Sequence, residues 1–116
     1  MAADGCLFCR IAAKEIPAKI VHEDADVVAF EDIAPQAPVH VLVIPRRHVA
    51  STAELAPADE AMLGRLLLTA ARLAAQLALM PAGYRWVINC GPGAGQTVPH
   101  LHLHLLGGRR LGWPPG

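Results

Sequence analysis

Three histidines alternate with leucines near the end of the chain, in the run His100-Leu101-His102-Leu103-His104-Leu105-Leu106. Side chains two residues apart on a β-strand point to the same face and stand about 7 Å apart. Imidazole can act as a neutral nucleophile, a proton donor or a metal ligand, because its pKa is about 6.5. The run could also be a half-buried strand with histidines on its outer face. Because three of the six histidines fall within this run, we favour a reaction centre with His102 as its nucleophile.

A glycine-rich loop directly precedes the histidine run. Gly91, Gly93 and Gly95 would let the backbone approach an anion, and Gln96 and Thr97 add an amide and a hydroxyl. The same residues could form an ordinary hairpin turn. Their position just before the histidines indicates chemistry at phosphorus.

Cys6 and Cys9 form a Cys-x-x-Cys pair, and Cys90 stands apart from them. The start of the chain carries Asp4 and lacks the basic segment of a secretory signal, and no apolar stretch is long enough to span a bilayer. We therefore expect a cytoplasmic protein without a membrane partner. In that setting the pair indicates metal binding or redox chemistry before a structural disulfide. It could also be two small buried residues of a first helix.

The elements that must position these groups are those of an α+β domain. β-Branched runs and flanking turn residues predict strands at 27–30, 39–44, 84–89 and 100–106. Apolar residues at three- and four-residue steps predict one long helix between Pro57 and Pro81, and residues 8–14 suit a short first helix. Strands on both sides of one main helix favour an antiparallel sheet with its helices on one side.

Length and composition limit the possible functions. The 116 residues suffice for a single domain, 1–116, and 53% hydrophobic against 17% charged residues excludes intrinsic disorder. Ten basic and ten acidic residues cancel, so the chain lacks the broad positive charge that nucleic acid binding uses. An anionic ligand must therefore be held by a local site.

The pattern His-x-His-x-His followed by two apolar residues resembles the histidine triad (HIT) family, in particular its purine nucleoside phosphoramidase branch. The resemblance runs through 14–20, 30–38, His40, Ile44-Pro45, the long helix, Gly95-Gln96, 107–109 and 113–116. It implies an antiparallel sheet of about five strands with one long and one short helix, assembled as a two-fold dimer. It also implies hydrolysis of the P–N bond of adenosine or guanosine 5′-phosphoramidates.

The resemblance further implies a role for each matching residue. His102 would attack the α-phosphorus and form a nucleotidyl-histidine intermediate, assisted by His104, His40 and Thr97. The nucleotide-binding positions implied are Phe30, Asp32, Ile33, Asn89, Gly95, Gln96, Thr97, His102, His104 and Trp113. Without the resemblance, Asp32 could be a turn carboxylate and His40 a core histidine. Trp113 belongs to a tail that would reach the partner's active site in the dimer.

Bacterial members of the family hold zinc between a cysteine pair and two histidines, and the matching residues here are Cys6, Cys9, His48 and His100. Two thiolates and two imidazoles suit a closed tetrahedral site, so this zinc would be structural. His100 would then be a metal ligand, which leaves His102 and His104 for chemistry. The resemblance implies no redox cofactor.

Two other functions remain open at the level of sequence. The branch usually has Ser where Thr97 stands, Tyr where Pro99 stands and a larger residue where Gly112 stands. The chain could therefore be a purine-nucleotide-binding module with weak catalysis. Alternatively, the alternating histidines could themselves hold a catalytic zinc ion.

Overall fold

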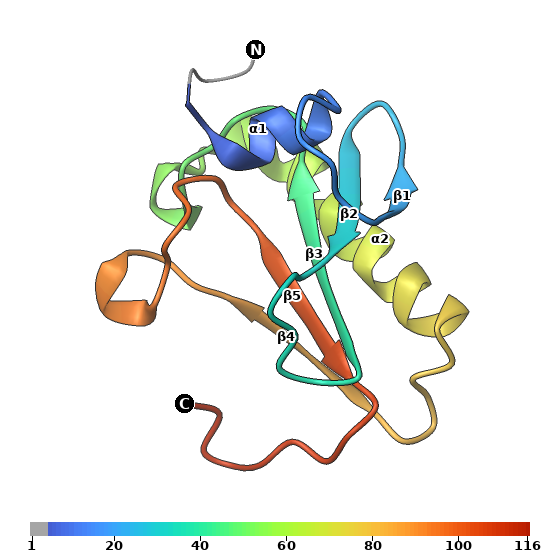
Figure 1. The fold of residues 1–116 in the computed structure, drawn as a ribbon. Helices are drawn as coiled ribbons and strands as arrows, with labels where there is room; N and C mark the ends of the chain where they lie inside the picture. The colour runs from blue at the N-terminus through green and yellow to red at the C-terminus, as the bar shows by residue number, and fades with distance from the viewer. Residues whose placement is uncertain (1–4) are drawn as a thin grey trace.

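A five-stranded antiparallel sheet forms the centre of the computed structural model, which describes residues 5–116 (Figure 1). Its order is β1-β2-β3-β5-β4. The strands are β1 (Ile20–Glu23), β2 (Val27–Glu31), β3 (Val39–Pro45), β4 (Tyr84–Ile88) and β5 (Leu103–Gly107). The α+β class and the antiparallel sheet are confirmed. Asp4 and the other residues before Gly5 in the expected 1–116 domain lie outside the described residues.

Two helices pack on opposite faces of this sheet, so the expectation that the helices lie on one side is wrong. α2 (Glu60–Gln76) covers one face, where Leu103 and Leu105 of β5 are fully buried beneath it. α1 (Leu7–Ala12) packs its buried side chains against Phe30 and Leu42 on the other face. Within residues 5–116 no helix combines the length and the apolar character needed to cross a membrane.

The strand register places the histidines on the face that carries α1. Leu42 of β3 is paired with His104 of β5, and His40 is paired with Leu106. Paired residues share a face of the sheet, and alternate residues along one strand share it too. β5 therefore gives its leucines at 103 and 105 to the core under α2 and presents His104 beside His40.

The structure corrects several expected boundaries. The long helix is shorter than the 57–81 segment: a 3-10 turn at Pro57–Asp59 precedes it, and it ends at Gln76. Ala78 has a φ of 56°, which a right-handed helix cannot continue through. The first helix likewise stops at Ala12, before Lys14 with its φ of 61°.

The expected strand at 100–106 is wrong for its first three residues, since β5 begins only at Leu103. The Leu101 N–H donates to the Val49 carbonyl at 2.6 Å, so this segment bonds to the loop after β3 instead of to β3. Pro99 has no N–H with which to start the strand earlier. The expected strand at 84–89 ends at Ile88, and β1 is a short edge strand that the sequence analysis did not predict.

Candidate active site and metal centre

The histidine run divides between two sites instead of forming one row. His100 is fully buried and turns toward the cysteines of α1, whereas His102 and His104 line a cleft beside the same helix. The late start of β5 permits this, because residues 100–102 are free of the sheet's register. The alternation predicts a common face, whereas the structure places the three histidines at two separate sites.

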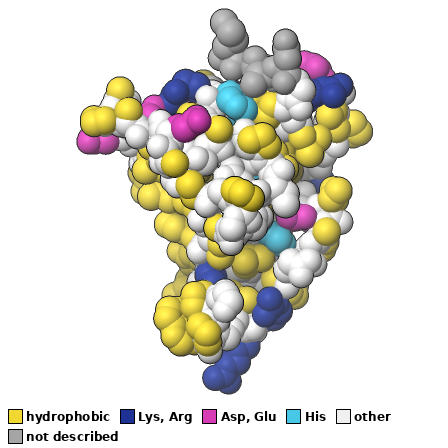
Figure 2. All heavy atoms as spheres, turned by 90° about the vertical axis from the view of Figure 1, so that its left-hand side faces the viewer, with side chains coloured by type: hydrophobic (Ala, Val, Ile, Leu, Met, Phe, Trp, Pro, Cys, Tyr) yellow, Lys and Arg dark blue, Asp and Glu magenta, His cyan; other side chains and the backbone are white. Residues whose placement is uncertain are grey.

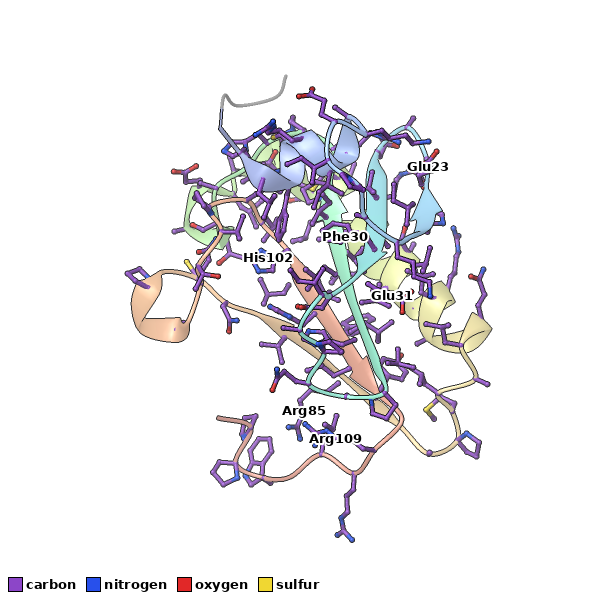
Figure 3. All side chains as sticks on the ribbon, in the orientation of Figure 1. Glu23, Phe30, Glu31, Arg85, His102 and Arg109 are labelled. Atoms are coloured by element: carbon purple, nitrogen blue, oxygen red, sulfur yellow. The ribbon has the colours of Figure 1, made fainter. Side chains whose placement is uncertain are left out.

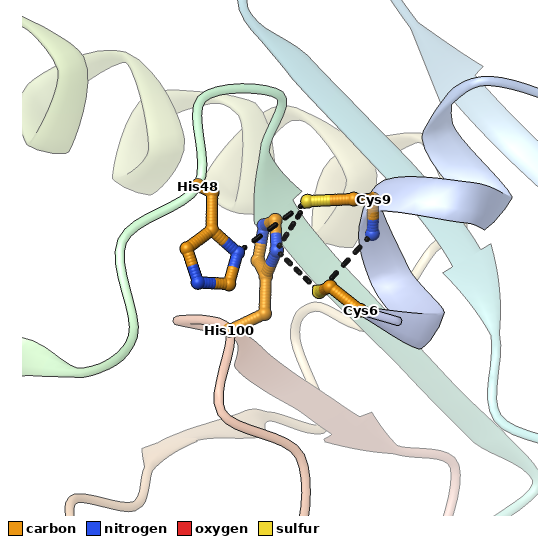
Figure 4. Close-up of side chains that lie close together, drawn as sticks. All are labelled: Cys6, Cys9, His48 and His100. Atoms are coloured by element: carbon orange, nitrogen blue, oxygen red, sulfur yellow. Dashed lines mark hydrogen bonds between the residues drawn. The ribbon is translucent and has the colours of Figure 1, made fainter. Parts of the chain in front are cut away.

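The first site is a cluster of two thiols and two imidazoles (Figure 4). The Sγ atom of Cys6 lies 3.3 Å from His100 Nδ1, and the Sγ atom of Cys9 lies 3.4 Å from His48 Nδ1 and 3.5 Å from His100 Nδ1. All four potential ligand atoms lie within 4.8 Å of one another. Cys6 caps α1 by accepting the Cys9 N–H, so the start of this helix fixes both sulfurs.

The hydrogen bonds and pKa of His100 suit a metal ligand. Its Nε2–H donates to the Pro45 carbonyl at 2.8 Å, which leaves the lone pair of Nδ1 facing the two sulfurs. Burial lowers the pKa of His100 to about 4, so the ring is neutral at pH 7, as metal coordination requires. A second hydrogen bond from the far ring nitrogen is the usual way in which a ligating histidine is oriented. The four residues therefore fit a closed tetrahedral zinc site.

The second site is a cleft of about 360 Å³ between α1, the segment at residues 16–18, the end of β2 and the histidines. Its polar lining includes Asp32, Thr97, His102 and His104. Its apolar lining includes Leu7, Phe8, Ile11, Ile16, Phe30 and Leu42. In Figure 3, Phe30 and His102 lie near each other below α1. A pocket with one apolar wall and one polar wall suits a ligand in which an aromatic base is joined to a charged group.

The α1 wall was missed by the sequence analysis. The ring of Phe8 stands edge-on to Phe30, with centroids 5.3 Å apart, and edge-on to His102, with centroids 5.0 Å apart. The motif at 14–20 contributed to the family resemblance, yet it was given no role at the site. The apolar spacing of Leu7, Phe8 and Ile11 was a signal available in the sequence.

The hydrogen bonds around the cleft fix which ring nitrogens carry protons. The Gln36 N–H donates to His40 Nδ1 at 3.0 Å, so the proton of neutral His40 is on Nε2. That Nε2–H lies 2.9 Å from His104 Nδ1, which accepts it, and 3.4 Å from Asp32 Oδ2. His104 therefore carries its own proton on Nε2, a buried atom with no partner among residues 5–116.

His102 has the complementary arrangement. Its Nδ1–H donates to the His100 carbonyl at 2.7 Å, so the lone pair is on Nε2. The side chain is buried and lines the cleft. A lone pair on His102 and an N–H on His104 thus stand side by side, with ring centroids 5.0 Å apart.

Burial keeps the supporting histidines neutral. It lowers the pKa of His104 to about 4, and nearby His102 and His40 lower it further, whereas Asp32 acts in the opposite direction. Burial also lowers the pKa of His40, against the raising effect of Asp32. Neutral rings are what the tautomers above require.

A catalytic metal on the histidines does not fit this geometry. Asp32, His40 and His104 do bring ligand atoms within 4.8 Å of one another. However, His40 Nε2 carries a proton because Nδ1 accepts the Gln36 N–H, and a protonated nitrogen cannot ligate. The hydrogen bonds run from Gln36 through His40 to His104, with Asp32 beside His40, and this arrangement argues against the zinc-dependent alternative.

The remaining predicted site residues are placed as follows. Asp32 both lines the cleft and accepts the Ala34 N–H at 2.8 Å, so its turn role and its cleft position coexist. Ile33 lines the cleft but is 99% exposed, so it stands at the rim and not in a wall. Thr97 lines both the cleft and the hollow beside His48.

The structure does not bring Asn89, Gly95 or Gln96 into the cleft. The Gln96 side chain accepts the Gly91 N–H at 2.9 Å and donates to the Ala50 and Val98 carbonyls at 2.7 and 3.0 Å, so it ties the glycine-rich loop to the loop after β3. Trp113 also lies outside the cleft of its own chain and is 84% exposed. In Figure 2 hydrophobic side chains gather with lysines or arginines at the lower end of the molecule, where Figure 1 places the C-terminal tail.

Comparison with known proteins identifies the family. The model of the HIT domain matches residues 13–111. An uncharacterised HIT-like protein of Synechococcus elongatus is 55% identical over 114 residues, which are 98% of this chain and 99% of that protein. Protein HitA of Neisseria gonorrhoeae is 47% identical over 104 residues, 90% of this chain and 96% of that protein. The chain belongs to the HIT family.

Solved structures of HIT proteins agree with this assignment. The HIT family hydrolase of Legionella pneumophila is 50% identical, with a TM-score of 0.95 and coverage of 97% of this chain and 100% of that one. The histidine triad nucleotide-binding protein of Candida albicans is 36% identical, with a TM-score of 0.80 and coverage of 95% and 83%. The HIT match begins at residue 13, so Cys6 and Cys9 lie outside it. Half of the candidate metal cluster therefore comes from α1, which precedes the matched span.

Proposed function

We propose that this HIT protein is a purine nucleoside phosphoramidase, which hydrolyses the P–N bond of adenosine or guanosine 5′-phosphoramidates. The observation that carries the proposal is the orientation of His102, whose Nδ1–H is bonded to the His100 carbonyl so that its Nε2 lone pair is available. The likeness to the Legionella pneumophila hydrolase and to the Candida albicans nucleotide-binding protein supports a hydrolase acting on a nucleotide.

The first chemical step is attack of His102 Nε2 on the α-phosphorus. A P–N bond to histidine forms, and the substrate's P–N bond breaks as the amine leaves with a proton taken from solvent. The positive charge that develops on the His102 ring is stabilised by the His100 carbonyl, which already accepts its Nδ1–H. The unpartnered Nε2–H of His104 is the donor that suits a phosphoryl oxygen gaining negative charge.

Water completes the reaction in a second step. Its oxygen bonds to phosphorus and gives a proton back to solvent, and His102 leaves with its Nε2 lone pair restored. The products of the two steps are a free amine and a nucleoside 5′-monophosphate. Imidazole suits both steps, since it is a nucleophile when neutral and a good leaving group when protonated. The apolar cleft wall at Phe8 and Phe30 would hold the base, and Asp32 would accept hydrogen bonds from the ribose hydroxyls.

We further propose that Cys6, Cys9, His48 and His100 hold a structural zinc ion. When bound, this ion would supply no catalysis and would tie α1 to the loop after β3 and to the start of the histidine run. The support is the donor set and the tautomer of His100 described above. No step at phosphorus requires it.

A two-fold dimer is proposed on the exposed side of α2 and the β4 edge. Leu68 of α2 is 58% exposed, and β4 is an edge strand that carries half-buried Tyr84 and Trp86. Light scattering should give twice the chain mass of 12.3 kDa, and Leu68→Glu should lower it toward the monomer. A monomeric wild-type protein at micromolar concentration would contradict this assembly, and with it the role of Trp113 at a partner's site.

The test of the function is kcat/KM for an adenosine 5′-phosphoramidate carrying a fluorescent amine. We expect turnover by the wild-type protein, and loss of turnover but not of AMP binding in His102→Ala. His22→Ala is the matched control, because His22 lies on β1 and is not among the cleft residues. AMP binding without turnover by the wild-type protein would instead leave a nucleotide-binding module.

A further inference from the structure

The segment Gly108-Arg109, which directly follows β5, is closely fitted to the loop at residues 32–38. Gly108 has a φ of +87°, and a Cβ added there would stand 2.9 Å from Pro38 Cβ. Next to it, the Arg109 Nε–H donates to the Gln36 carbonyl at 2.9 Å, and its Nη1 donates to the Arg110 carbonyl at 2.9 Å. The segment therefore holds this loop from the side away from the histidines.

The same loop also determines which ring nitrogens of His40 and His104 carry protons. Gln36 is held at its carbonyl by Arg109, and its N–H donates to His40 Nδ1. Its amide side chain donates to the Ala34 carbonyl at 2.9 Å and so stays within the loop. One residue thus connects the C-terminal segment to the chain of hydrogen bonds that leads through His40 to His104.

If the Gln36 N–H no longer donated to His40 Nδ1, both histidines could adopt their other neutral tautomer. His40 could then carry its proton on Nδ1 and present a lone pair at Nε2 to His104. His104 would have to answer with its own Nδ1–H, because two facing lone pairs repel. Its Nε2 would then be a lone pair directed at the substrate's phosphoryl oxygen, where the proposed chemistry needs a donor.

We propose that Arg109 is a positioning residue: its bond to the Gln36 carbonyl holds the tautomer of His40, and through it the Nε2–H of His104. The expected effect of Arg109 on turnover rests on the proposed function. Its expected effect on the tautomers of His40 and His104 is independent of that function. Arg109 is not among the residues that line the cleft, and Figure 3 places it with Arg85 at the end of the molecule away from His102. Its influence on chemistry therefore passes through the loop and not through contact with substrate in the same chain.

The experiment compares Arg109→Met and Arg109→Lys with Arg110→Met. Arg110 is the matched control, because it is the next exposed arginine and removing its side chain leaves the bond to Gln36 intact. Arg109→Lys keeps the charge but has a methylene where Nε donates. The first readout is the ¹⁵N chemical shifts of the ring nitrogens of His40 and His104 at neutral pH, assigned with a His40→Gln variant. The second is kcat and KM for the phosphoramidate.

We expect both rings to be Nε2-protonated in the wild-type protein and in Arg110→Met, and to mix tautomers in both Arg109 variants. We expect kcat to fall about tenfold with KM unchanged, within the roughly hundredfold that a small misplacement of a reacting group can cost. Unchanged tautomers in Arg109→Met would overturn the inference, as would a rise in KM alone or wild-type behaviour of Arg109→Lys. If the wild-type protein has no turnover, the proposed function fails while the tautomers still decide this inference.

Discussion

Replacement of Phe8 by alanine is the most direct test of how α1 serves the cleft. Phe8 is 4% exposed, and its ring touches Phe30 and His102 edge-on. Truncation of a buried Phe to Ala costs about 3–5 kcal/mol, which includes the cavity left behind. A domain of this size has about 5–15 kcal/mol of stability, so the variant should fold but unfold at a much lower denaturant concentration.

The assay is urea unfolding followed by circular dichroism, together with kcat and KM for the phosphoramidate. We expect the free energy of unfolding to fall by about 3 kcal/mol or more. We also expect KM to rise, because the base loses one wall of its pocket. Leu7→Ala is the matched control: Leu7 lines the same cleft from α1 but is 43% exposed, so its loss of stability should stay below about 1 kcal/mol. A loss below about 1 kcal/mol for Phe8→Ala would refute the packing argument.

Three further predictions concern metal, pH and the core. Cys9→Ser should abolish zinc in purified protein measured by mass spectrometry and lower the melting temperature, whereas Cys90→Ser should retain zinc; equal zinc in both variants would count against the cluster. His104 has a folded pKa of about 4 against an ordinary 6.5, so unfolding takes up protons and its stabilising contribution, full above 6.5, should fade as pH falls toward 4. His104→Gln should flatten that part of a stability-against-pH curve, and an unchanged slope would disprove the assignment. Leu105→Ala should cost about 2–5 kcal/mol in urea unfolding, because Leu105 is fully buried under α2; a smaller loss would mean that this face of the sheet is loosely packed.

The sequence could predict those parts of the site that depend on the alternation of residues along a strand or on the family resemblance. The alternation at 100–106 correctly placed leucines in the core, and the resemblance brought His40 and Asp32 into the same neighbourhood as His104. The departure of His100 from the common face of the strand could not be predicted from periodicity, although the family resemblance implied it, since it depends on a backbone hydrogen bond from Leu101 to Val49. That bond joins segments about fifty residues apart in the sequence, which no local pattern records.

The glycine-rich loop is a case in which residue type predicted a ligand contact that the structure does not show. Its residue types are those of an anion-binding loop, and together with the family resemblance they predict that Gln96 contacts the nucleotide. In the structure the Gln96 amide is bonded to three backbone groups around its own loop. A polar side chain satisfies whichever partners folding brings within reach, so residue type alone could not separate a ligand contact from an internal brace.

The metal cluster and the nucleophile meet at His100, but they use different parts of that residue. The ring faces the two sulfurs, whereas the group that holds His102 is the backbone carbonyl. Every amino acid supplies a carbonyl, so position 100 can exchange its side chain without depriving His102 of its acceptor. Loss of the proposed metal centre by substitution at position 100 would therefore leave the hydrogen bond that orients His102 in place.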